Sequence, residues 1–207
     1  RQVYSIVTKT LQGSFGPVDS LLRQNLAQRL LGSPRALLTT IRRIIQHPET
    51  TPAARQILNE LTDLLLDFPI TSRQLVLVDL CREWVDDPEK GKVLVFCQQT
   101  DVLKDILRVL EQHDFTTASF HGQISRTAQR EATERFRDEA QIMVSNDAGA
   151  LGLNWQFANC VVNYVLPWNP MKIEQRIGRV HRVTQTRDVH VANMFALNTI
   201  DETHTTY

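Results

Sequence analysis

The chain has 207 residues, 23 basic and 23 acidic side chains, and 42% hydrophobic residues. This is the composition of an ordinary globular protein, so it excludes wholesale disorder and a polybasic, histone-like binder. Three cysteines without Cys-x-x-Cys spacing argue against a disulfide framework or a zinc ribbon and indicate a reducing, cytoplasmic setting. No apolar run approaches the ~18–20 residues of a membrane span, so we expect no membrane partner. Because the first residue is Arg1 and not Met, we expect the chain to be a piece of a longer protein.

Residues 1–70 have the periodicity of helices. An N-cap residue followed by proline at the first helical position occurs twice, at Ser33-Pro34 and Thr51-Pro52, and apolar residues at helical spacing follow each pair. A further helix can start at Thr71 or Ser72. No catalytic grouping stands out in residues 1–70, which we expect to form a helical packing segment.

From about residue 90 the pattern alternates between strands and helices. Strands are expected at residues 92–97, 116–120, 141–145, 160–166 and 188–196, and helices at 101–113, 125–137 and 170–182. Such alternation predicts an α/β fold, with a parallel sheet and helices on both faces. Ligands in this class of fold bind at the carboxyl edge of the strands.

Polar and glycine-rich residues follow the predicted strands. Hydroxyls, glycines and helix N-termini suit phosphate groups, and an exposed tryptophan suits stacking on a nucleotide. The residues of these kinds are Gln98, His121-Gly122, Ser125-Arg126, Ser145 to Asp147, Gly149, Gly152, Asn154 and Trp168-Asn169.

The most specific signal is the run from Gln175 to Gln185. Arg179 and Arg182 are three residues apart, so they are expected on one face of the predicted helix. Two guanidinium groups in that arrangement can clamp a phosphoryl group. Gly178, next to Arg179, leaves room for a close approach.

These residues resemble a known family. Gln175 to Arg182 resembles motif VI of superfamily-two helicases, Gln-x-x-Gly-Arg-x-x-Arg, and Ser145 to Asn154 resembles motif V. Trp168-Asn169-Pro170 and Gln185 are similar to the SWI/SNF family of ATP-dependent DNA translocases. The closest similarity is to its bacterial and archaeal branch, which includes the RNA-polymerase-recycling ATPase. The resemblance covers roughly residues 72–203.

The resemblance implies that residues 71–207 are the second RecA-like lobe of a two-lobed motor, truncated at its end, and that residues 1–70 are the helical segment between the lobes. The partners it implies are double-stranded DNA, the upstream lobe of the same protein and RNA polymerase or other proteins. The implied roles are catalytic arginine fingers for Arg179 and Arg182, ATP binding for Gly152, Asn154 and Gln175, and nucleic-acid binding for Gln98, His121, Gly122, Arg126, Ser145 and Trp168.

The parts of the upstream lobe are absent from the sequence. There is no Gly-x-x-x-x-Gly-Lys-[Ser/Thr] loop for phosphates and no Asp-Glu-x-His-type string for Mg²⁺. We therefore expect the cofactor, ATP with Mg²⁺, to take its metal ligands from that lobe, and this chain alone to be inactive. Two departures from relatives are Asp147, where many carry Lys or Arg, and Val165, where the strand usually ends in Asp.

Two other interpretations stay open. The chain could be a lobe of a DEAD/DEAH-type RNA helicase, although Trp168-Asn169-Pro170 and Gln185 speak against it. It could also be a degenerate lobe that serves as a docking module. Asp147 supports that reading, and the intact Arg179 and Arg182 count against it.

Overall fold

A computed structural model describes residues 26–27, 29–68, 70–87, 90–147, 154–167, 169–183, 185–197 and 199. Its described residues form two compact units. The first contains those up to Ser72 together with those from Ala196 on, and the second runs from Arg73 to Phe195. Among the described residues no helix is long and apolar enough to cross a membrane.

The first unit contains the helices α3 (Pro34–Ile45) and α4 (Pro52–Leu66), which pack against each other. Both begin where the cap signals predict. The Ser33 hydroxyl accepts a hydrogen bond from the Ala36 N–H at 3.0 Å, and the Thr51 hydroxyl accepts one from Ala54 at 3.2 Å. Leucines of both helices share one buried cluster, which includes Leu37 and Leu58. These helices are therefore held by their apolar stripes, as the periodicity predicts.

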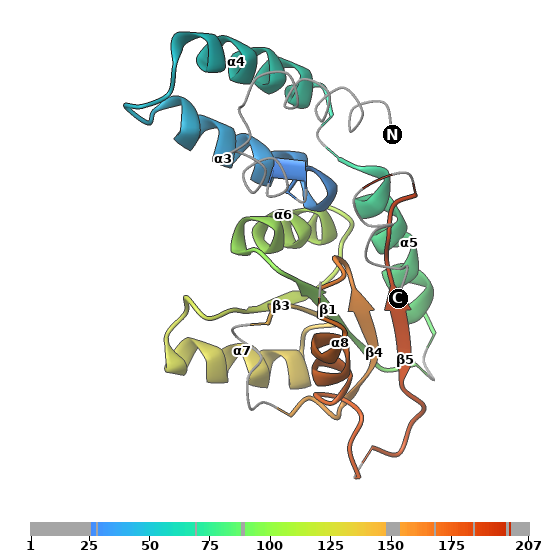
Figure 1. Ribbon diagram of the computed structural model, residues 1–207. Helices are drawn as coiled ribbons and strands as arrows, with labels where there is room; N and C mark the ends of the chain where they lie inside the picture. Colours follow the sequence, from blue (N-terminus) through green and yellow to red (C-terminus); the bar gives the residue numbers. More distant parts are fainter. Residues whose placement is uncertain are drawn as a thin grey trace. The chain divides into compact units, whose positions relative to one another are not determined.

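The second unit is built on a parallel sheet of five strands in the order β2-β3-β1-β4-β5 (Figure 1). Its elements in chain order are α5 (Ser72–Val85), β1 (Lys92–Cys97), α6 (Thr100–Glu111), β2 (Thr117–Phe120), α7 (Arg126–Asp138), β3 (Ile142–Asn146), β4 (Ala158–Asn163), α8 (Pro170–Ile177) and β5 (His190–Asn193). Every strand pair is parallel, so the strands share one carboxyl edge. Central β1 is almost fully buried, which explains its continuous apolar run.

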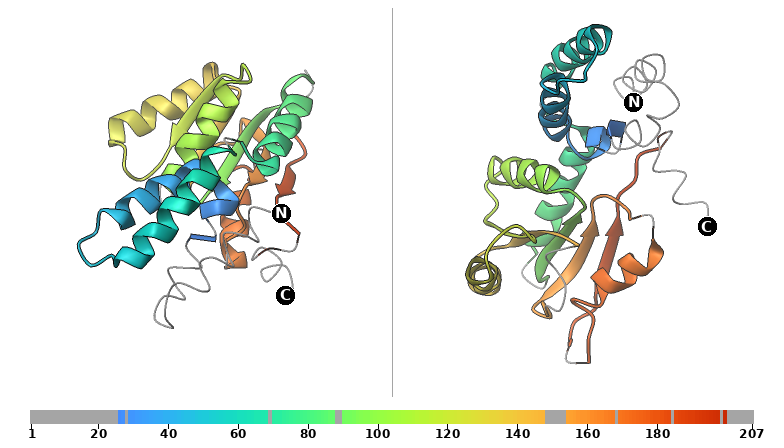
Figure 2. Two further views of the ribbon diagram at one scale, coloured as in Figure 1. Left: turned by 90° about the horizontal axis from the view of Figure 1, so that it is seen from above. Right: turned by 60° about the vertical axis from the view of Figure 1, so that its left-hand side comes forward.

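Helices cover both faces of this sheet, as Figures 1 and 2 show. On one face, α7 and the residues around α8 pack on alternate strand residues, including Leu94, Phe96 and Val161, around the buried Trp155. On the other face lie α5 and α6, which are joined by a buried 2.7 Å hydrogen bond from Gln74 to Asp105. The predicted α/β fold with helices on both faces is thus confirmed.

Three predicted boundaries in the second unit are wrong. The fourth strand, predicted at 160–166, runs from Ala158 to Asn163, and the last strand is only His190–Asn193. The helix predicted at 170–182 ends at Ile177. This third difference bears on the candidate site, because it removes Arg179 and Arg182 from the helix.

Substitution of Phe136 tests this packing. Its fully buried ring meets Trp155 and Phe157 edge to face, with centroid distances of 6.5 and 5.2 Å. We expect Phe136→Ala to lower the free energy of unfolding by about 3–5 kcal/mol, because it leaves a cavity under the sheet. The matched control is Phe195→Ala, since that ring is 49% exposed, and it should cost about 1 kcal/mol or less. Equal losses in urea titrations would contradict the assignment of the core.

Candidate functional site

The residues that follow β1 and β2 form what we call the strand-end surface: Gln98, His121, Gly122 and Arg126. His121 is buried, with 9% of its surface exposed. Gln98 is half-buried, and its amide donates to the Leu166 carbonyl at 3.2 Å, which ties the end of β1 to the segment after β4. Gly122 and Arg126 are exposed. Arg126 is the first residue of α7, whose N-cap Ser125 accepts from Ala128 N–H at 3.2 Å.

His121 contributes no charge to this surface at neutral pH. Burial, together with the nearby positive charge of Lys104, lowers the pKa of the imidazole from its ordinary value. The ring is fixed, since its Nδ1 atom accepts a hydrogen bond from Gln123 N–H at 3.3 Å. A neutral imidazole can contact a phosphate by a hydrogen bond but adds no Coulomb attraction, so Arg126 is the fixed charge of the strand-end surface.

The structure does not bring every residue of the sequence prediction to this surface. Ser145 lies on β3 and is fully buried, and its hydroxyl donates to the Asn146 carbonyl at 3.2 Å. It is therefore not part of the strand-end surface. Gly152 and Trp168 lie outside the described residues.

Arg179 and Arg182 lie in a turn after α8 and not on the helix itself. The helix ends with Gly178 as its C-cap, and turn bonds follow, from Arg179 N–H to the Arg176 carbonyl at 3.1 Å and from Val180 N–H to the Ile177 carbonyl at 2.9 Å. We call residues 178–183 the arginine turn. The expectation that the two arginines share a helix face is therefore wrong.

A tertiary hydrogen bond fixes the position of the arginine turn. The Arg179 carbonyl accepts from Trp155 N–H at 2.8 Å. Trp155 comes shortly before β4, so the arginine turn lies beside the start of that strand, away from the strand-end surface at the carboxyl edge. Asn154, which is exposed, is the neighbour of Trp155 in the chain, so this bond brings it next to Arg179. Gln175 is exposed on α8.

Gln185 holds the other end of the arginine turn. Its side-chain amide donates to the Gln156 and Ala158 carbonyls, both at 2.9 Å, and lies 3.4 Å from the Val180 carbonyl. Its amide oxygen accepts from Arg187 N–H at 3.1 Å. Gln185 thus works as an anchor between the turn and the start of β4, a role that the sequence motif alone does not reveal.

The arginine turn brings two positive charges together at a partly buried position. Burial, and secondarily the neighbouring guanidinium of Arg182, lower the pKa of Arg179 from its ordinary value. Arg179 stays charged because an arginine pKa is far above neutrality. A desolvated cation beside a like charge gains most from a bound anion, so the turn fits a phosphate group.

Behind the turn, Arg176 is buried in a polar cluster. Its Nε donates to the Asp147 carboxylate at 2.7 Å, and its Nη1 donates to the Asn163 side chain at 2.8 Å and to the Val165 carbonyl at 3.3 Å. Its guanidinium lies over the Phe96 ring, 5.1 Å from the centroid. Arg176 therefore ties α8 to the carboxyl ends of β1, β3 and β4.

This cluster also explains the two departures noted in the sequence. Asp147 binds Arg176 and, at 3.5 Å, Lys172, so its carboxylate serves α8 inside the fold. Val165 contributes through its backbone carbonyl, which any side chain would allow. The sequence analysis gave Arg176 no role. The feature of the sequence that could have pointed to Arg176 is the carboxylate of Asp147, which has no cationic residue close to it in the chain.

The described residues fit a phosphate better than a metal. They contain no group of three or more His, Cys, Asp or Glu side chains that could hold a metal ion. The carboxylate of Asp147 is already bound by two cations. A nucleotide phosphate would find guanidinium donors here.

The chain belongs to the family of helicase conserved C-terminal domains, whose family model matches residues 75–184. It is 30% identical over 202 residues to the uncharacterized ATP-dependent helicase YqhH of Bacillus subtilis, covering 97% of this chain and 35% of that protein. RNA polymerase-associated protein RapA of Proteus mirabilis is 38% identical over 105 residues, covering 49% of this chain and 11% of RapA. Helicase SWR1 of Mycosarcoma maydis is 33% identical over 114 residues, 54% of this chain and 6% of SWR1.

These relatives confirm the resemblance to SWI/SNF-type ATP-dependent helicases. The chain spans 35% or less of the length of these three relatives. Solved structures agree on the fold. The C-terminal part of the Fun30 ATPase domain matches with a TM-score of 0.63 and 19% identity over 86% of this chain and 69% of that one. The helicase domain of Pyrococcus furiosus Hef matches with a TM-score of 0.63 and 20% identity over 97% and 46%.

Arg176→Met tests the buried cluster. The change removes the charge and all three hydrogen bonds, and it leaves the buried Asn163 oxygen without this donor. We expect the free energy of unfolding to fall by about 3 kcal/mol, at the lower end for a broken buried pair, because Lys172 still faces Asp147.

The matched control for that measurement is Lys172→Met. Its side chain is 49% exposed and its ion pair is long, at 3.5 Å, so the loss should be about 1 kcal/mol or less. If urea unfolding shows the two variants to be equally stable, Arg176 does not tie α8 to the sheet.

Proposed function

We propose that this chain is the second motor lobe of an ATP-dependent translocase that moves on double-stranded DNA. In this proposal Arg179 and Arg182 are the arginine fingers, and the upstream lobe of the same protein supplies the phosphate loop and the Mg²⁺ ligands. Bound ATP would supply the phosphoryl group that is transferred to water. The observation that carries the proposal is the arginine turn, where a partly desolvated Arg179 is fixed beside Arg182.

In this proposal the two arginines stabilise the negative charge of the transferred phosphoryl group. Negative charge on the oxygens of a transferred phosphoryl group is stabilised by preorganised cations, which need no reorganisation when the charge develops. The Trp155–Arg179 bond and the Gln185 anchor support such preorganisation, because both hold the backbone of the turn. Gln175 and Asn154 lie next to the arginines in the fold or in the chain, which supports their proposed contact with the nucleotide.

The strand-end surface is the proposed contact with nucleic acid, through Arg126, Gly122, His121 and Gln98. Such contacts to phosphates position a duplex without reading its sequence. Trp168 and Gly152 keep their proposed roles from the family resemblance. Ser145, being buried, is left out of the proposed contact.

The Arg176 cluster supports communication between the two proposed sites. It joins α8, which leads into the arginine turn, to the strand ends next to the strand-end surface. A shift of α8 would therefore displace the residues at the ends of β3 and β4 that bind Arg176. Because half of a nucleotide site between lobes would lie on the other lobe, we propose that the chain alone does not hydrolyse ATP.

The relatives and the cysteines support proposals on partners and location. RapA is named as an RNA polymerase-associated protein, and its similarity to this chain makes RNA polymerase a proposed partner. The described cysteines are all unpaired and buried, which suits a reducing compartment and supports a cytoplasmic location.

The first test is ATP hydrolysis by the protein with its upstream lobe present, with and without duplex DNA. We expect DNA to stimulate turnover and Arg182→Ala to reduce it about 10³-fold, as loss of an arginine finger does. The control Arg135→Ala removes an exposed arginine of α7 and should leave turnover unchanged.

Other outcomes of this test separate the alternatives. Stimulation by RNA alone would assign the lobe to an RNA helicase of the DEAD/DEAH type. No turnover under any condition, with normal folding, would leave a docking module. Turnover that Arg182→Ala does not reduce would remove the finger role.

A second test measures binding to duplex DNA at several salt concentrations. If Arg126 contacts a phosphate, Arg126→Ala should weaken binding equally for unrelated sequences and lower the slope of log affinity against log salt by about one. Arg135→Ala should leave the slope unchanged. A sequence-dependent loss, or an unchanged slope for Arg126→Ala, would argue against a phosphate contact.

A further inference from the structure

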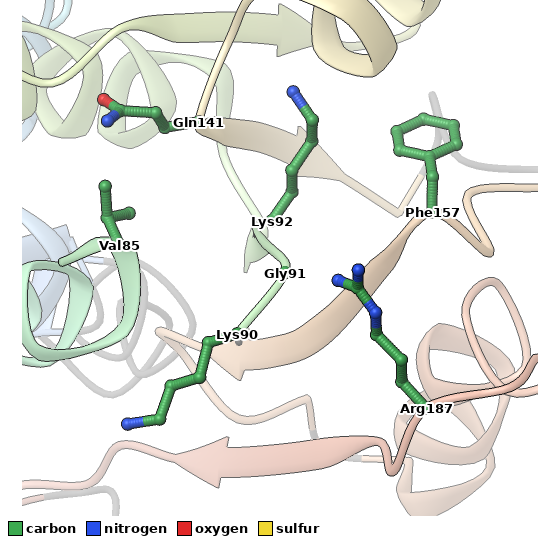
Figure 3. Close-up of a pocket in the computed structure, with 7 residues that line it drawn as sticks. All are labelled: Val85, Lys90, Gly91, Lys92, Gln141, Phe157 and Arg187. Carbon is green, nitrogen blue, oxygen red and sulfur yellow. The ribbon is translucent and has the colours of Figure 1, made fainter. Parts of the chain in front are cut away.

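A pocket of about 340 Å³ lies at the beginnings of β1, β3 and β4, away from the strand-end surface (Figure 3). Its lining is rich in basic side chains and contains no acidic one: Val85, Lys90, Gly91, Lys92, Gln141, Phe157 and Arg187. A positive lining is unexpected in a chain with no net charge. Neither the strand-end surface nor the arginine turn includes any of these residues.

Arg187 is the central cation of this pocket. In Figure 3 its guanidinium is turned toward Gly91 and Lys92. Its backbone is held by the 3.1 Å hydrogen bond to Gln185, so the side chain starts from a fixed point. Among the described residues, no carboxylate lies within ion-pair distance of this guanidinium. Arg187 is exposed and lines the pocket, so its guanidinium is accessible to a ligand there.

The Arg187 guanidinium lies against the backbone of Gly91. A Cβ atom at Gly91 would come within 3.0 Å of the Arg187 Nη1 atom and would clash with the Asn159 side chain. The Gly91 N–H is already used, since it donates to Asn159 Oδ1 at 2.9 Å. The donors that remain for a ligand are those of side chains.

Lys92 adds a second cation that lacks a close acidic partner. Its Nζ donates to the Ala140 carbonyl at 2.7 Å and lies 5.9 Å from the centroid of the Phe136 ring. Burial lowers the pKa of Lys92, and the charge of Asp138 opposes this only in part. A bound anion would offset the cost of burying this ammonium group.

Lys90 is less available to a ligand in this pocket than Arg187. Figure 3 shows its side chain extending to the other side of Gly91 from Lys92. Its ammonium already lies 3.6 Å from Asp87 and 3.8 Å from Glu83, and it contacts the Trp84 ring. It therefore adds positive potential at longer range and is not counted among the direct ligands.

We propose that this pocket binds a phosphate group through the guanidinium of Arg187, while Lys92, which lines the same pocket, adds positive charge. A guanidinium forms charge-assisted hydrogen bonds with phosphate oxygens. The volume leaves room for more than the phosphate alone, so the group can belong to inorganic phosphate or to the backbone of a nucleic acid. The site does not depend on the proposed motor function, because none of its ligands belongs to the arginine turn.

The test is a titration of the isotopically labelled chain with inorganic phosphate at constant ionic strength. The observed signals are the Gly91 backbone amide and the Nε–H of Arg187. The charge-assisted contact with Arg187 in a positive pocket predicts saturable shifts with a Kd of about 1 mM, and chloride at matched ionic strength should produce none. Arg187→Gln should weaken binding about tenfold or more.

Two control variants locate the binding. Arg130→Gln removes an exposed cation of α7 that pairs with Glu134 at 3.8 Å, and Arg182→Gln alters the arginine turn. Both should leave the affinity for phosphate at Gly91 unchanged. Binding that Arg182→Gln removes and Arg187→Gln preserves would place the phosphate at the arginine turn and overturn the proposal.

A second arm replaces phosphate with a short DNA duplex. Shifts at Gly91 with the duplex at micromolar concentration, lost in Arg187→Gln, would identify the nucleic-acid backbone as the source of the phosphate. Shifts with inorganic phosphate alone would identify a free anion. Absence of saturable shifts with both, in a chain whose spectrum shows it folded, would overturn the proposal.

Discussion

The buried guanidinium of Arg176 is the contact on which the arrangement of the second unit depends. A charged group removed from water needs a charged partner and hydrogen bonds in several directions, and here these come from Asp147, Asn163 and Val165. Because the partners sit at the ends of β3 and β4, they hold α8 against this edge of the sheet. One Arg176 donor, Nη2, is buried without a hydrogen-bond partner. The cluster thus defines the geometry of the guanidinium although one of its hydrogen-bond donors has no partner.

From this fixed helix, the chain reaches the arginine turn within two residues. Gly178 ends α8, and the Arg179 carbonyl, which would accept a helical hydrogen bond if α8 continued, is taken by Trp155 N–H. The turn thus combines local hydrogen bonds with a tertiary one. Its consequence is that the two arginines are held by the sheet and by α8 together, which is the rigidity that charge stabilisation requires.

Local signals in the sequence predicted much of the fold. Ser33-Pro34 and Thr51-Pro52 begin helices as expected, and the apolar run of Lys92–Cys97 is β1. The errors arise where distant residues decide. The turn after α8 is bonded to Trp155, and the partner of Arg176 is 29 positions away. Likewise, no local pattern could show that Ser145 faces inward, because a strand buried on both sides has no polar face. Motif spacing thus names the residues of a site but not their contacts.

Gln185 illustrates how specific such a contact is for one type of side chain. Its amide nitrogen faces three backbone carbonyl oxygens, while its amide oxygen faces a backbone N–H. Glutamate has the same shape, yet its carboxylate has no hydrogen to offer and would bring a negative charge against those oxygens. Exchange of one nitrogen for one oxygen would thus release the segment that carries both Arg182 and Arg187. The position distinguishes an amide from an acid without touching any ligand.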